Sequence, residues 1–90
     1  MRPANLVFIL SDEHQRDVTG CYGNHLVRTP NIDELATRGT RFTSAYTPCP
    51  ICVPARAALA TGRWVHQTGS WDNAFPYHGE LPSWHRRLRD

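Results

Sequence analysis

The sequence predicts an α/β layered fold, in which helices cover a mostly parallel central sheet, and three observations support it. Residues 5–10 contain a continuous apolar run rich in strand formers, which is typical of a strand buried on both faces. Residues 41–47 have strand propensity with rough alternation of apolar and polar side chains. Helical segments lie between and after these two strands, and that order of elements is typical of α/β domains.

Composition and charge exclude several classes of protein. The chain has 90 residues, a formal net charge of +2 and 40% hydrophobic residues, which suits one small globular domain. The arginines are scattered except for Arg86, Arg87 and Arg89, which suit a solvated helix face better than a nucleic-acid site, so we expect no nucleic-acid partner. The longest apolar run is far shorter than a membrane span or a signal-peptide core, so we expect no membrane partner and a cytoplasmic location. The 3 cysteines do not suggest a disulfide framework.

Two acidic residues, Asp12 and Glu13, follow the first predicted strand directly. In open α/β sheets, ligands bind outside the carboxyl ends of the strands. Carboxylate oxygens at such a place suit a hard divalent cation. An alternative of about equal weight is that the two acids cap the next helix.

The next elements are marked by turn and helix signals. Residues 17–24 predict a short helix followed by a loop, because the segment ends in turn formers. Residues 29–39 predict a helix that begins at Pro30 or Asn31 and stops at Gly39. Its apolar face would consist of Ile32, Leu35 and Ala36.

The centre of the chain carries a Cys-x-Pro-x-Arg pentad formed by Cys52, Pro54 and Arg56. Proline is tolerated only in the first turn of a helix, so Pro54 places Cys52 at the start of an alanine-rich helix. Gly62 suits the left-handed position just after that helix. The pentad therefore sets a thiol and a guanidinium beside a helix N-terminus, which is a favourable place for an anion.

The last part of the chain loses helical periodicity. Residues 64–77 are rich in aromatic, amide and turn-forming side chains, a composition that suits either a pocket-lining loop or a packed surface loop. Residues 82–90 predict the start of another helix, with Ser83 as its cap.

The pentad, followed by Ala57 and by Thr61-Gly62-Arg63, resembles the signature of the formylglycine-dependent sulfatases of the alkaline-phosphatase superfamily. The pattern Thr-Pro-Asn-Ile-Asp, Leu-Ala, Gly and Arg-Phe in residues 29–46 extends the resemblance. The commonest pentad has serine where this chain has Ala55. The resemblance implies that residues 1–90 are the N-terminal portion of one alkaline-phosphatase-like sandwich domain, truncated before the remaining metal and leaving-group residues.

The resemblance also implies the chemistry. A formylglycine-generating enzyme would oxidise Cys52 to Cα-formylglycine, whose aldehyde hydrates to a geminal diol. One oxygen of that diol would be the nucleophile that attacks a small-molecule sulfate ester. Asp12, Glu13 and residue 52 would bind a divalent cation, with calcium favoured over manganese, magnesium or zinc. Arg56 would act beside the nucleophile. Asn73 matches a group-binding asparagine in the branch of choline sulfatases and phosphonate monoester hydrolases, so hydrolysis of phosphonate monoesters or phosphodiesters is the alternative.

Two other classes of function compete with this interpretation. Cys49 and Cys52 form a Cys-x-x-Cys motif ahead of a helix, which is where a thiol redox pair lies in thioredoxin-like proteins. That motif is much less specific than the pentad. A non-catalytic interaction module is the other alternative.

Overall fold

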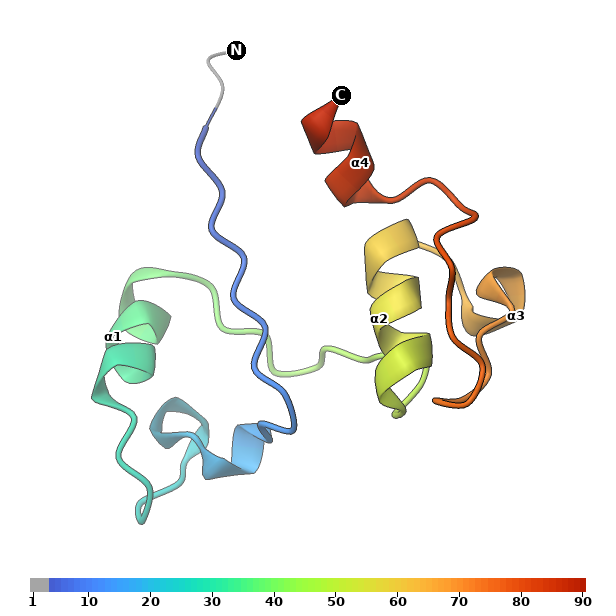
Figure 1. Cartoon of the computed structure of the whole chain (residues 1–90). Helices are drawn as coiled ribbons and strands as arrows, with labels where there is room; N and C mark the ends of the chain where they lie inside the picture. The colour runs from blue at the N-terminus through green and yellow to red at the C-terminus, as the bar shows by residue number, and fades with distance from the viewer. Residues whose placement is uncertain (1–3) are drawn as a thin grey trace. The chain divides into compact units, whose positions relative to one another are not determined.

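The computed structural model describes residues 4–90, and every regular element in this range is helical (Figure 1). The described chain divides into two compact units. One unit ends at Thr43, and the other is Ser44–Asp90. Each unit has its own packing.

The first unit contains two short 3-10 helices, η1 (Arg16–Val18) and η2 (Gly20–Tyr22), and the helix α1 (Pro30–Arg38). The predicted helix in residues 29–39 is thus confirmed, and Gly39 follows its last residue. Residues 17–24 form 3-10 turns instead of a regular short helix. They end at Gly23, whose φ of 103° lies in the left-handed region.

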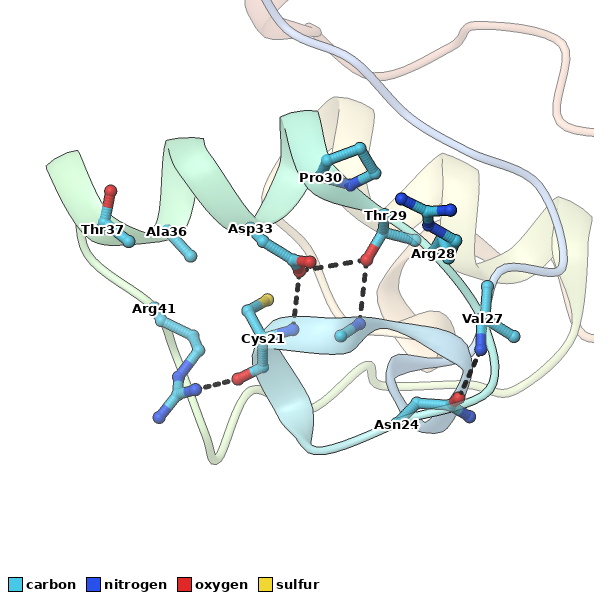
Figure 2. A pocket seen from close by; sticks show the side chains of 11 residues that line it. Cys21, Asn24, Val27, Arg28, Thr29, Pro30, Asp33, Ala36, Thr37 and Arg41 are labelled. Carbon is cyan, nitrogen blue, oxygen red and sulfur yellow. Dashed lines mark hydrogen bonds between the residues drawn. The ribbon is translucent and has the colours of Figure 1, made fainter.

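One carboxylate, that of Asp33 on α1, holds η2 against this helix (Figure 2). Its Oδ1 accepts hydrogen bonds from the Cys21 N–H at 2.6 Å and from the Thr29 hydroxyl at 3.0 Å. The Thr29 oxygen in turn accepts the Gly20 N–H at 2.8 Å. The N–H groups of Gly20 and Cys21, which have no partner within the 3-10 turn, thus both find acceptors on Thr29 and Asp33. These bonds fix η2 on α1.

We expect Gly20→Ala to lower the free energy of unfolding by about 1 to 3 kcal/mol. The reason is that a Cβ atom at position 20 would lie 2.5 Å from Oδ2 of Asp33. Asp33→Ala should cost about 2 kcal/mol, because it removes the acceptor of the Cys21 and Thr29 bonds. In the double variant, Gly20→Ala with Asp33→Ala, the carboxylate that would clash with the new Cβ atom is absent. The decreases in unfolding free energy of the two single variants should therefore not add. Urea unfolding of the polypeptide at its natural length measures all three; additive costs would contradict the prediction.

Side chains rather than a neighbouring strand bind the main chain at the end of the first unit. The Tyr22 hydroxyl donates to the Phe42 carbonyl at 2.7 Å, and Arg16 Nη1 donates to the Thr43 carbonyl at 3.0 Å. Arg41 donates back to the Cys21 carbonyl and lies over the Tyr22 ring. The segment that was expected to be a strand is therefore held by η1 and η2.

No strand occurs within residues 4–90, so the two predicted strands are not observed. The apolar run in residues 6–10 is exposed throughout, and Ile9 retains 82% of its accessible surface. A strand exists only when its N–H and C=O groups pair with another segment, and strands of a parallel sheet come from distant parts of a chain. The central sheet stays a prediction.

The second unit is built around α2 (Cys52–Thr61), which packs against α3 (Val65–Thr68) and α4 (Trp84–Arg89) (Figure 1). Pro54, Ala57 and Ala58 form its buried face, where small side chains allow close approach. Gly62 has a φ of 67° and ends the helix as predicted. Ser83 Oγ accepts the Arg86 N–H at 3.4 Å and caps α4, also as predicted.

The helix α3 was missed in the sequence, where residues 64–77 were expected to be a loop throughout. The Gln67 side chain accepts the Trp64 N–H at 3.0 Å, which stabilises this single turn. So short a helix leaves no periodic pattern to detect. Among residues 4–90, no helix is long and apolar enough to cross a membrane.

Candidate functional site

The two pentad side chains predicted to be catalytic lie on one face of α2. Cys52 is the first residue of the helix, and Arg56 follows one turn later. Residues so spaced stack along one helix face. This face lies opposite Ala57 and Ala58, so both Cys52 and Arg56 are exposed. The helix therefore presents a thiol and a guanidinium together to solvent while its small residues are buried.

The N-terminus of α2 contacts a loop that lies well after it in the sequence. Asn73 Oδ1 accepts a hydrogen bond from the Val53 N–H at 2.9 Å, across 20 positions of the chain. Val53 directly follows Cys52. The structure thus brings the predicted substrate-binding residue Asn73 next to the predicted nucleophile.

The loop that carries Asn73 has a defined conformation. Asp72 Oδ1 accepts the Ala74 N–H at 2.7 Å, which forms a turn around Asn73. Ser70 is only 2% exposed, and its hydroxyl donates to the Phe75 carbonyl at 2.9 Å, which closes the loop. Sequence reasoning identified neither supporting residue. Asp72 next to an asparagine was a turn signal that could have pointed to it.

The two predicted metal-binding acids, Asp12 and Glu13, lie in the first unit, and both are exposed. Glu13 has a φ of 55°, a left-handed backbone conformation that a non-glycine residue adopts at a cost of about 1 kcal/mol. They belong to a different unit from Cys52, so the metal site that they would share with residue 52 stays a prediction.

These two acids do not by themselves make a metal site. Their oxygens are of the kind that calcium or magnesium prefers, but such cations take about six or more ligands. Within residues 4–90, no group of three or more His, Cys, Asp and Glu side chains is placed to hold a metal ion.

The histidine that follows these acids has a structural partner. His14 Nε2 lies 2.7 Å from the hydroxyl of Thr19, which is only 3% exposed. This bond satisfies a buried hydroxyl at the junction of η1 and η2.

A pocket of about 600 Å³ lies in the first unit (Figure 2). Its lining includes Cys21, Arg28, Asp33 and Arg41. Figure 2 shows the Asp33 carboxylate directed at the Cys21 N–H and at Thr29, and Arg41 directed at the Cys21 carbonyl. Asp33 and Arg41 are thus bound to other residues of the lining, and the pocket contains no residue of the pentad.

Comparison with known proteins identifies the family. The model of the family described as Sulfatase matches residues 4–88. The uncharacterized sulfatase YidJ of Escherichia coli strain K12 is 45% identical over 73 residues, which cover 81% of this chain and 15% of that protein. Human arylsulfatase A is 50% identical over 70 residues, covering 78% of this chain and 14% of that protein. No solved structure matches.

The chain therefore belongs to the sulfatase family, as the resemblance implied. A third relative, the N-acetylglucosamine-6-O-sulfatase of Bacteroides thetaiotaomicron, is 34% identical over 85 residues, which cover 94% of this chain and 15% of that protein. None of these three relatives is a choline sulfatase or a phosphonate monoester hydrolase, so they support the family and not the branch. The chain spans about 15% of the length of these relatives.

Proposed function

We propose that this chain is the nucleophile-bearing part of a hydrolase that converts sulfate monoesters and water into an alcohol and sulfate. The observation that carries the proposal is the arrangement at α2, where Cys52 and Arg56 share an exposed face and Asn73 contacts the first turn. Membership of the sulfatase family supports the reaction class. The family also implies that a formylglycine-generating enzyme modifies Cys52 and that a divalent cation assists.

Each residue at α2 has a distinct role in this proposal. Residue 52, as formylglycine that has added water to form a geminal diol, supplies the hydroxyl oxygen that attacks sulfur and displaces the alcohol, and its exposed position at the helix start gives an ester access to it. Arg56 donates charge-assisted hydrogen bonds to anionic oxygens beside it. The Asn73 amide donates a hydrogen bond from Nδ2 to a sulfuryl oxygen. The helix N-terminus adds a partial positive charge that favours the same anion.

The chemical character of the ester is suggested by the side chains beside Asn73. Trp71 is 58% exposed and Phe75 is 57% exposed, and they flank Asn73 two positions away on either side. Large exposed rings bind apolar or aromatic groups by stacking and attract quaternary ammonium groups through cation–π contacts. The proposal therefore favours aryl or quaternary-ammonium esters over small aliphatic ones.

The exposed apolar run in residues 6–10 supports a second part of the proposal, a central parallel sheet. Its side chains are exposed on both sides of the segment, which costs free energy in water. A strand covered by helices on both faces would bury them all. In such a sheet, Asp12 and Glu13 would lie at the carboxyl end of the first strand.

Peptide mass tests the proposal. Trypsin releases residues 42–56 as one peptide, because no lysine or other arginine lies between Arg41 and Arg56. In protein from its own host at natural length, we expect formylglycine at position 52 and a thiol at Cys49. A Cys49–Cys52 disulfide would instead favour the redox alternative, and two intact thiols would contradict a formylglycine nucleophile.

A panel of esters tests the substrate. We expect the same protein to hydrolyse an aryl sulfate about fivefold or more faster than a small aliphatic sulfate, because one ring contact contributes about 1 kcal/mol. Faster turnover of phosphonate monoesters or phosphodiesters would favour the alternative reaction. A preference for small aliphatic sulfates would contradict the role of Trp71 and Phe75.

A further inference from the structure

The N-terminus of α2 has an unusual shortage of local hydrogen-bond partners. Its N-cap residue is Ile51, whose side chain has no acceptor. Pro54 lies in the first turn and has no N–H group. The N–H groups of Cys52 and Val53 therefore need acceptors from outside the helix, and a helix that begins without a side-chain cap frays more readily at its first turn.

The acceptor for Val53 comes from the loop of Asn73. The distance from the Val53 nitrogen to Asn73 Oδ1 is 2.9 Å, which is an ordinary length for such a bond. It has the chemistry of an asparagine N-cap, although the side chain comes from a distant position. We infer that Asn73 is a positioning residue, which caps α2 and thereby holds residue 52 in place. Its role in catalysis rests on the proposed function; the cap does not.

The same bond fixes which way the Asn73 amide points. A backbone N–H can only donate, so the amide must present its oxygen to Val53 and turn Nδ2 away. An amide flip would bring two donors together and lose the bond. Val53 thus orients the Nδ2 donor, and one side chain links the nucleophile helix to the group that would bind the sulfuryl oxygen.

The loop is built to hold this orientation. The turn at Asp72 and the buried bond from Ser70 to the Phe75 carbonyl fix the main chain on both sides of Asn73. The helix α3, which precedes the loop, packs against α2 in the same unit. The cap is therefore supported by the packing of the second unit as well as by one hydrogen bond.

Two substitutions at position 73 separate the cap from the donor. Asn73→Asp keeps an oxygen acceptor for Val53, and its charge suits a helix N-terminus, but it lacks the Nδ2 donor. Asn73→Ala removes both. Asn31→Ala is the matched control, because Asn31 lies in the exposed first turn of α1 in the other unit.

The measurement is amide hydrogen exchange at Val53 in the protein at its natural length. We expect exchange to become about fivefold to tenfold faster in Asn73→Ala, and to stay within about twofold of the parent in Asn73→Asp and Asn31→Ala. Unchanged exchange in Asn73→Ala would overturn the cap. Exchange accelerated equally by Asn73→Asp would overturn it too, because an acceptor alone should restore the bond.

Kinetics on a sulfate ester, normalised to the formylglycine content of each preparation, test the consequence for catalysis. We expect Asn73→Ala to lower kcat about 10- to 100-fold, because residue 52 is less well placed. Asn73→Asp should instead chiefly raise KM, because its carboxylate repels the anionic ester. If Asn73→Ala and Asn73→Asp change kcat by the same factor and KM by the same factor, Asn73 is not a positioning residue. Absence of hydrolysis in the parent would count against the proposed function alone, since the exchange result does not depend on it.

Discussion

Cys52→Ala is expected to lower kcat/KM for a sulfate ester by at least about 10⁴-fold, because it removes the nucleophile on which the reaction depends. The free energy of unfolding should hardly change. Cys52 is exposed at the start of α2, and alanine is a good helix former. Steady-state kinetics and urea unfolding of the two proteins give both quantities.

Cys49→Ala is the matched control for this prediction. Cys49 is half-buried and precedes α2, and it has no role in the proposed reaction. We expect it to retain activity within about threefold. If both alanine variants lose activity alike, the Cys-x-x-Cys pair acts as a unit and the redox alternative is favoured. If Cys52→Ala retains activity, the proposed nucleophile is wrong.

Arg56→Ala is expected to lower kcat/KM by about 10²- to 10³-fold, which is the usual effect of removing a preorganised donor from a developing charge. Arg56→Lys should recover only part of this loss, since an ammonium group keeps the charge but not the planar fork of donors. Urea unfolding of both variants separates this loss of activity from any change in stability.

Arg63→Ala provides the control for this second prediction. Arg63 is also exposed and lies in the same unit, just beyond Gly62 at the far end of α2. The Arg63→Ala substitution removes the same positive charge from the unit, but at a greater distance from residue 52. If both variants lose activity equally, the effect of Arg56 is general electrostatics; a fully active Arg56→Ala variant would exclude its proposed role.

Each of the two units is held together by side-chain hydrogen bonds more than by a buried apolar core. Each unit is held by a few side-chain bonds to the main chain: Asp33 and Tyr22 in the first, Asn73 and Ser70 in the second. Few large apolar side chains are buried, and the buried hydrophobic residues of the described chain are Ala57 and Ala58. The bulk of the apolar surface, including residues 6–10, is thus available to be covered when the proposed sheet forms.

Local signals predicted α1 and α2 well, because they act within a few residues of one another. Pro30 and Pro54 lie in the first turns of these helices, where proline fits. Gly39 follows α1 in an extended conformation, whereas Gly62 ends α2 in the left-handed conformation that glycine tolerates. The position of Pro54 also predicted that Cys52 and Arg56 lie near the N-terminus of α2. The predicted strands cannot be established from local signals in the same way, because a strand forms its hydrogen bonds with another segment of the chain.

The family, the helix that carries residue 52 and the residue types at the candidate site follow from the amino-acid sequence alone. The residues that hold that site together are known from the three-dimensional structure. The bond from Val53 to Asn73 spans 20 positions, and that from Cys21 to Asp33 spans 12. No periodicity or spacing rule records such pairs, because they form only where packing brings an unpaired N–H group to a side-chain oxygen. In this protein, such bonds join the candidate nucleophile to the loop that would bind its substrate.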